Sequence, residues 1–436
     1  MIIPKSIGGS NNPDSQSRDL PQKLEPYVNV VTCLILATSF LFWDISRAIY
    51  VLLSLASLLY IVVFRPKMPS DHKLYSWPII IFLCTTVLSL LFHGFSDSGV
   101  NSVISRFFLL LLAIPIAVTS FITFDKSSNT WVKFSIACII MGVIALIDSF
   151  YLDKTAANGG YNSAMFGMAA LSMTAVAVAS FHRCAELRWG KFLFTTSILL
   201  GLVAIILSAS RTTWFSSVII FLIAGYFLLD RYNLSKRFLI ILLSLAAAAT
   251  VAATQPKSQA RFFNMIEIIT PYLKGDEQTQ HTSLRLRVEV WKMGWQIGME
   301  NKLIGYGPGE TKRVIKHYAT EYPQYHGLQS LRNFHNQFIQ SFAMCGVPGL
   351  ISYLLLVVCH FWLFFKYLNK QYNREVRMLA LSGLLLVVTY LLKAFLGVSF
   401  YDKQQLLVYG IASATLWGSL SAAANKSLLS AKPSFG

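Results

Sequence analysis

The sequence predicts an all-α polytopic membrane protein with about twelve transmembrane helices. Its 436 residues are 55% hydrophobic, with a mean hydropathy of +0.54. Apolar stretches recur along the chain, many close to the roughly 20 residues that a helix needs to cross a bilayer. No alternating pattern is long enough for a membrane barrel. Helices are expected because they satisfy their own backbone groups in lipid.

The expected spans follow one another with short loops through the first half of the chain. They cover residues 27–43, 48–64, 76–95, 105–124, 132–152, 162–181, 191–210, 212–229, 237–254, 347–366, 376–396 and 404–424. The seventh and eighth almost adjoin, so residues 208–213 are expected to form a tight turn at one membrane face. The first 25 residues are polar and lack the apolar core of a signal peptide, so the first span should act as an uncleaved insertion signal.

Positive charge predicts the orientation of the chain, because short cytoplasmic loops are enriched in Lys and Arg. The loops after even-numbered spans carry most of these residues. Even-numbered loops and both termini are therefore expected in the cytoplasm. The formal net charge of +17 would also suit a nucleic-acid partner. However, the basic residues are spread over many short loops, which membrane insertion explains, so no nucleic acid is expected.

One long loop on the outer face interrupts the succession of spans and short loops. Residues 255–334 follow the ninth span, and loops of this length usually carry function or structure of their own. Leu284, Val288, Trp291 and Trp295 recur near helical spacing, so amphipathic helices at the membrane surface are expected. The predicted division is a cytoplasmic tail (1–25), nine transmembrane helices (26–254), the loop (255–334), three transmembrane helices (335–424) and a second cytoplasmic tail (425–436).

Cysteine and histidine spacing indicates neither a disulfide framework nor a metal site. The six cysteines lie mostly in or beside apolar stretches and form no CxxC pair, which favours buried small side chains. The histidines show no HxxxH or HExxH spacing. Neither a metal ion nor another cofactor is therefore expected.

Arg211 is the first candidate for chemistry. It ends the run Leu-Ser-Ala-Ser-Arg between two apolar spans. An arginine at the edge of the hydrocarbon is costly unless it snorkels to water or meets an anion. On the outer face it would lie at headgroup depth, where a guanidinium can hold a pyrophosphate by paired hydrogen bonds. Position alone leaves both interpretations open.

Arg285 and Arg287 form a second cationic point, in the long loop. Two residues apart on a helix, they point to different faces. One is expected to enter a site while the other pairs with Glu289 or water. A solvated helix face explains the two arginines equally well.

Two further motifs complete the candidate set. The run Gly-Tyr-Gly-Pro-Gly at 305–309 marks a turn. Its amides either form a simple turn or bind an anion, with Gly307 and Gly309 as substrate-binding residues. His335 and Asn336 stand where the long loop returns to the membrane. A lone interfacial histidine is usually structural, but this one shares a face with the arginines and can take a proton near neutral pH.

In this order the motifs resemble the O-antigen ligase and polymerase superfamily. The resemblance rests on Ser-Ala-Ser-Arg (208–211), Arg-Val-Glu-Val-Trp (287–291), Gly-Tyr-Gly-Pro-Gly (305–309) and His-Asn-Gln-Phe-Ile-Gln with Gly-Val-Pro-Gly (335–349). It covers the chain from about the seventh to the tenth span. It implies about twelve transmembrane helices with one large periplasmic loop, in a membrane-embedded glycosyltransferase of GT-C-like type that needs neither metal nor ATP.

The resemblance further implies an inner-membrane O-antigen ligase, which moves a glycan from undecaprenyl pyrophosphate to lipid A-core at the periplasmic face and completes lipopolysaccharide. Carried onto this chain, Arg211 and Arg287 (or Arg285) bind the donor diphosphate. His335 is then the general base of an inverting transfer, and Asn336 beside it is expected to bind substrate. An O-antigen polymerase acting on carrier-linked glycans is the alternative. A transporter is the alternative from another class, although spans almost free of acidic residues and without paired broken helices argue against it.

Overall fold

The computed structural model describes residues 13–39, 42–124, 127–160, 162–181, 188–229, 233, 235–236 and 283–430. Within these ranges every regular element is a helix. Ten of these helices are long and apolar enough to cross a membrane. The prediction of an all-α polytopic membrane protein is therefore confirmed.

The helices fall into two groups along the chain. The first contains α1 (Pro13–Thr38), α2 (Trp43–Phe64), α3 (His72–His93), α4 (Asp97–Ser102), α5 (Phe108–Leu111), α6 (Ala113–Ile122), α7 (Ser127–Leu146), α8 (Ser163–Ser180), α9 (Gly190–Leu207) and α10 (Arg211–Leu228). The second contains α13 (Ser283–Glu300), α14 (Thr311–Glu321), the 3-10 helix η5 (Pro323–Leu328), α15 (Gln337–Phe365), α16 (Arg374–Leu396) and α17 (Lys403–Ser430). Elements α4 to α6 form one continuous membrane-crossing helix, Asp97–Ile122.

Ten of the twelve expected spans coincide with the ten apolar helices. The span expected at 27–43 falls largely within α1, which begins earlier, at Pro13, and is not among the ten. The span expected at 237–254 lies outside the described residues, as does the first part of the long loop, 255–282. The tight turn is shorter than expected and occupies only residues 208–210.

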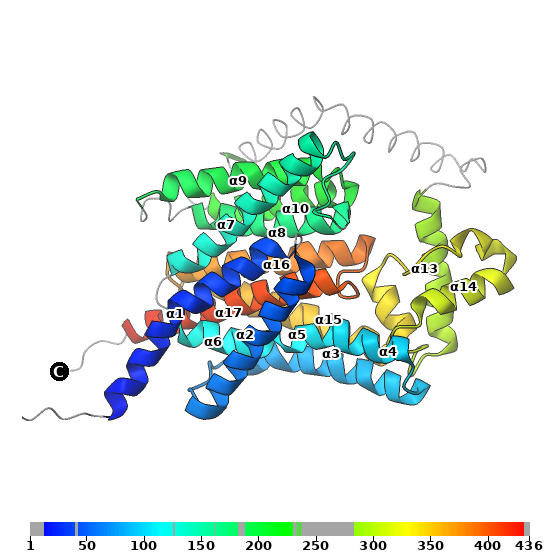
Figure 1. Ribbon diagram of the computed structural model, residues 1–436, viewed down its shortest axis with the longest axis horizontal. Helices are drawn as coiled ribbons and strands as arrows, with labels where there is room; N and C mark the ends of the chain where they lie inside the picture. The colour runs from blue at the N-terminus through cyan, green and yellow to red at the C-terminus, as the bar shows by residue number, and fades with distance from the viewer. Residues whose placement is uncertain are drawn as a thin grey trace, which may run out of the picture.

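Figure 1 shows the membrane-crossing helices lying side by side, with their connections at two opposite ends. The start of α1 and the end of α17 lie at the left end. Elements α4, α13 and α14 gather at the right end, and α13 runs across the ends of the other helices rather than alongside them. The described part of the long loop therefore covers one end of the bundle.

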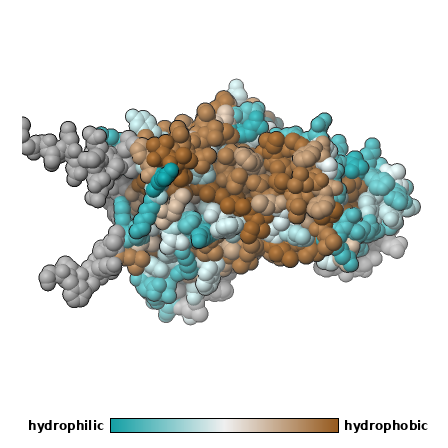
Figure 2. Space-filling model, turned by 90° about the horizontal axis from the view of Figure 1, so that it is seen from below, coloured by the Kyte–Doolittle hydropathy of each residue, from teal (hydrophilic) through white to brown (hydrophobic). Residues whose placement is uncertain are grey.

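The membrane-crossing helices divide into a buried centre and an exposed rim. The most apolar stretch of α17 is 100% buried, whereas that of α2 is only 17% buried. Apart from Asp44 in the first turn, the exposed side chains of α2 are apolar, and they include Leu52, Leu55, Leu59 and Val62. Figure 2 shows a broad hydrophobic area across the middle of one face, with hydrophilic residues towards its ends. Such a surface suits contact with the hydrocarbon of a bilayer.

α15 is interrupted near its start. Gly346 has φ +67° and ψ −161°, which is not helical. Pro348 has no N–H to donate, and the amide of Val347 donates to a carbonyl outside the helix at 2.7 Å. The carbonyls of Ala343 and Met344, four residues before these two, therefore lack their helical partners.

The glycine-rich turn before α14 supplies the missing donors. The amide of Tyr306 donates to the carbonyl of Ala343, and that of Gly307 to the carbonyl of Met344, both at 3.0 Å. At Gly305, with φ +68°, a Cβ atom would lie 2.3 Å from the carbonyl carbon of Met344. Only glycine fits there, and the long loop is thereby docked onto the broken helix.

Candidate functional site

Four segments converge at the end of the bundle that α13 crosses. They are the start of α10, α13 itself, the start of α15 and the end of α16, with α10 packed on α16 and α13 on α15. Asn336, just before α15, donates from Nδ2 to the carbonyl of Phe395 in the last turn of α16, at 3.3 Å. These contacts bring together side chains that are far apart in the sequence.

Arg211 is the first residue of α10 and directly follows the tight turn. Ala209 in this turn has φ +47°, which is strained for a residue with a side chain. The indole N–H of Trp214 donates to the carbonyl of Ile205 at 3.1 Å and ties the start of α10 to the end of α9. The side chain of Arg211 is half-buried. Within the described residues its guanidinium has no carboxylate partner.

Arg287 lies on the face of α13 that turns towards α15. Gly294, two helical turns further on, is on the same face. A Cβ atom there would lie 2.5 Å from Cγ2 of Ile339, so this side chain of α15 packs directly against the backbone of α13. Burial lowers the pKa of Arg287, and the charge of Arg211 lowers it as well. The structure thus brings these two arginines together, while Arg285 has an interaction of its own.

His335 carries its imidazole on a strained and tightly held backbone. Its φ is +50°, and its N–H donates to Oδ1 of Asn333 at 3.0 Å. The preceding ring, Phe334, is fully buried, and its N–H donates to Oε1 of Gln340 at 3.3 Å. Strained residues often mark functional sites, and here two of them, Ala209 and His335, lie at the same cluster.

Two glutamines in the first turns of α15 fix this segment to its surroundings. Nε2 of Gln340 donates to the hydroxyls of Tyr306 at 3.1 Å and Thr311 at 2.9 Å. Oε1 of Gln337 accepts from the amide of Phe400 at 2.9 Å. Both glutamines belong to the motif His-Asn-Gln-Phe-Ile-Gln, from which no role was predicted for them. Their spacing of three residues in an apolar helix indicates a shared inward face.

Positive charge surrounds the imidazole. Burial, followed by the charges of Arg287 and Lys393, lowers the pKa of His335 to about 4. The ring is therefore neutral at pH 7 and has a free lone pair. Sequence reasoning missed Lys393, which lies in the last turn of α16 and is only 6% exposed. A lysine within an apolar membrane helix is itself a signal of function.

Three residues predicted to bind substrate have structural partners. The amide of Gly307 donates to Met344. Gly309 has φ +87°, and a Cβ atom there would lie 2.2 Å from the carbonyl oxygen of Ser98. Oδ1 of Asn336 accepts from two backbone amides and caps α15. We assign all three to positioning, and their contact with substrate stays a prediction.

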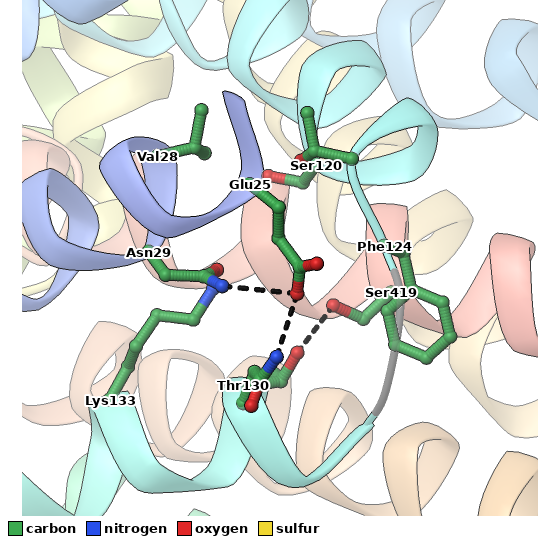
Figure 3. Close-up of a pocket in the computed structure, with 10 residues that line it drawn as sticks. Glu25, Val28, Asn29, Ser120, Phe124, Thr130, Lys133 and Ser419 are labelled. Atoms are coloured by element: carbon green, nitrogen blue, oxygen red, sulfur yellow. Dashed lines mark hydrogen bonds between the residues drawn. The ribbon is translucent and has the colours of Figure 1, made fainter. Parts of the chain in front are cut away.

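A small polar pocket lies at the opposite end of the bundle, between α1, α6, α7 and α17 (Figure 3). Oε1 of Glu25 accepts there from the amides of Asn29 at 3.2 Å and Asn129 at 2.7 Å. The hydroxyls of Thr130 and Ser419 lie 2.7 Å apart. None of the predicted site residues lines this pocket, so no chemistry is assigned to it.

Comparison with known proteins bears directly on the part of the cluster formed by α10, α13 and the start of α15. Residues 196–354 match the O-antigen ligase family. This ligase-family segment contains Arg211, Arg287, the glycine-rich turn and His335, so the resemblance that the motifs indicated is confirmed across it. The match supports a membrane function of the ligase or polymerase type. An uncharacterized protein of Haemophilus influenzae is 22% identical over 353 residues, which cover 78% of this chain and 85% of the relative.

Proposed function

We propose that this protein is an O-antigen ligase of GT-C-like type, which moves a glycan from undecaprenyl pyrophosphate to lipid A-core and completes lipopolysaccharide. The observation that carries the proposal is the meeting of Arg211, Arg287 and a neutral His335 at one end of a membrane-crossing bundle. The match of residues 196–354 supports the same class of reaction.

The two arginines bind the diphosphate of the donor. Neither Arg211 nor Arg287 has a carboxylate partner among the described residues, and the charge of Arg211 lowers the pKa of Arg287. A multivalent anion between them replaces this repulsion with attraction. Guanidinium groups hold phosphate by paired hydrogen bonds. Because Arg211 begins α10 at the edge of the apolar bundle, the isoprenoid tail of the donor can remain in the membrane.

His335 acts as the general base. Its neutral ring takes the proton of an acceptor hydroxyl, and the oxygen attacks the anomeric carbon of the glycan. The bond from that carbon to the diphosphate oxygen breaks, and undecaprenyl pyrophosphate leaves with the electron pair. A single displacement inverts the configuration at the anomeric carbon. Arg211 and Arg287 stabilise the charge of the leaving diphosphate. Within the described residues no group of His, Cys, Asp or Glu could hold a metal ion, so no side chain is assigned to one.

We place the cluster on the periplasmic side of the inner membrane. The connections 65–71 and 366–373 lie at the opposite end of the bundle. They carry Arg65, Lys67 and Lys370, as cytoplasmic loops do. The donor and the acceptor then meet the enzyme at the face where the long loop covers the bundle.

Reconstitution with purified lipids tests the proposal. The full chain in liposomes is given a carrier-linked glycan, with or without lipid A-core, and the products are separated by mass. Glycan attached to lipid A-core, and no product in its absence, is the expected result. Longer carrier-linked chains without lipid A-core would instead identify a polymerase. Glycan crossing the bilayer without any new bond would identify a transporter.

A further inference from the structure

We propose that Lys393 is a third cation of the donor site and binds the phosphate that carries the glycan. The inference rests on the proposed function, since it takes a lipid diphosphate as the donor. Lys393 lies in the last turn of α16, outside the ligase-family segment. Its role therefore comes from its position in this structure.

The amine of Lys393 is held inside the protein. The residue is 6% exposed, whereas a lysine at the end of a membrane helix usually extends its amine to water. A Cβ atom on Gly397 would lie 3.1 Å from Cε and 3.3 Å from Nζ of Lys393. The side chain is thus folded against the chain that follows α16. Among the described residues the amine has neither a hydrogen bond nor an ion pair, which is costly for a buried ammonium group.

Lys393 belongs to a group of charged side chains that is positive as a whole. The charges of Arg287 and Lys393 both act on His335, and Arg287 acts on Lys393. The carboxylate that acts on Lys393 is that of Asp402, whose Oδ1 also accepts from two backbone amides at the start of α17. Arg211, Arg287 and Lys393 carry three positive charges, and Asp402 supplies one negative charge. A ligand with several negative charges neutralises the excess.

The position of Lys393 beside the base indicates which phosphate it meets. Asn336, next to His335, donates to the carbonyl of Phe395, two residues after Lys393, at 3.3 Å. The base must lie beside the anomeric carbon of the glycan. Lys393, the buried cation beside the base, therefore faces the glycan-linked phosphate. Arg211, which begins α10 at the edge of the apolar bundle, then faces the lipid-linked phosphate. A carrier monophosphate has only the lipid-linked phosphate and would reach the arginines without reaching Lys393.

Binding of two carrier lipids to the full chain tests this assignment. The affinities for undecaprenyl pyrophosphate and undecaprenyl monophosphate are measured by calorimetry in nanodiscs. Lys393→Met should weaken pyrophosphate binding roughly ten- to hundredfold, the value of one charge-assisted hydrogen bond, and leave monophosphate binding unchanged. Lys292→Met, which removes an exposed lysine paired with Glu289, is the control and should change neither affinity.

Gly397→Ala provides a second variant that keeps the charge. Its new Cβ atom would displace the amine of Lys393, and it should give a smaller loss that is again confined to the pyrophosphate. The inference would be overturned if Lys393→Met lost the same affinity for both lipids, or if it still preferred the pyrophosphate as strongly as the wild type does. Either result would leave the proposed function in place. A wild-type chain that does not prefer the pyrophosphate would overturn both.

Discussion

The side-chain amide of Asn336 donates to the carbonyl of Phe395, 3.3 Å away, and so joins the start of α15 to the end of α16. His335 precedes one partner directly, and Lys393 lies two residues before the other. A single hydrogen bond therefore sets the base of the proposed reaction beside a buried cation. The first turn of α15 depends on the same residue, because Asn336 also caps that helix.

Substitution of the arginines should show which of them contribute to glycan transfer. Arg211→Ala and Arg287→Ala should each lower kcat/KM by roughly 10²–10³, as expected for one donor to a developing negative charge. Arg211→Lys should recover only part of this loss, because an ammonium lacks the planar fork of a guanidinium. Arg285→Ala, on a different face, is the matched control and should be milder. Glycan transfer to lipid A-core is the measurement, and a more severe effect at Arg285 would show that the other face of α13 enters the site.

The pH dependence of transfer should report His335. Its pKa of about 4 in the free protein means that the ring accepts protons above this pH and is protonated below it. The acidic limb of kcat/KM, which reports the free enzyme, should therefore lie near pH 4. Bound diphosphate offsets the charges of Arg287 and Lys393, which raises the pKa of the ring. The acidic limb of kcat, measured with donor bound, should accordingly lie at higher pH.

Removal of the imidazole provides the control for that profile. His335→Gln should lower the single-turnover rate by roughly 10²–10⁴ and leave donor binding intact, because the arginines hold the diphosphate. The residual rate should show no acidic limb. An unchanged limb in the variant, or a loss of donor affinity, would assign His335 to binding or positioning and require another base.

The glycine-rich turn should be sensitive to added side chains for steric reasons. Gly309→Ala would place a Cβ atom 2.2 Å from the carbonyl oxygen of Ser98 at a φ of +87°. Gly160→Ala is the matched control, since Gly160 has φ +81° but no atom within 4 Å of the new Cβ. The control should lose about 1–2 kcal/mol from its backbone conformation alone. Gly309→Ala should lose about 1–3 kcal/mol more. Thermal unfolding in detergent measures the difference, and equal midpoints would show that the turn can move away from Ser98.

The orientation of the bundle can be tested by thiol labelling. In a chain without native cysteines, Lys292→Cys on α13 and Lys370→Cys in the connection before α16 are both exposed. An impermeant thiol reagent applied to intact spheroplasts should modify the cysteine at 292 alone. The cysteine at 370 should react only after lysis. The reverse pattern would place the arginine cluster in the cytoplasm.

Sequence reasoning located the membrane-crossing helices because a bilayer imposes its thickness on the length of an apolar run. It also selected Arg211, Arg287 and His335, since charged groups at membrane depth are few and stand out. It left open whether Arg285 or Arg287 enters the site. That choice depends on the rotation of α13, which the close packing of Gly294 on α15 sets.

Other parts of the site depend on contacts that no local pattern reveals. The sequence allowed the amides of the glycine-rich turn to bind an anion. In the structure, the amides of Tyr306 and Gly307 donate to carbonyls of α15. That outcome depends on the missing N–H of Pro348, a residue far along the chain. A lysine in an apolar span marks Lys393 as unusual, but the sequence does not show that it lies near Arg287 and His335, which belong to α13 and to the segment before α15.

The break in α15 and the turn that completes it have a consequence for biogenesis. The ribosome delivers the turn before α15, so the amides of Tyr306 and Gly307 must wait for acceptors that have yet to be inserted. Until docking, the carbonyls of Ala343 and Met344 lack donors inside a membrane helix, which is unfavourable in lipid. We expect closure of this junction to be a late step of insertion. A chain in which the junction has not closed would expose an unsatisfied helix to membrane quality-control proteases. Defects in the turn should therefore reduce the amount of protein in the membrane more than the catalytic rate of each surviving molecule.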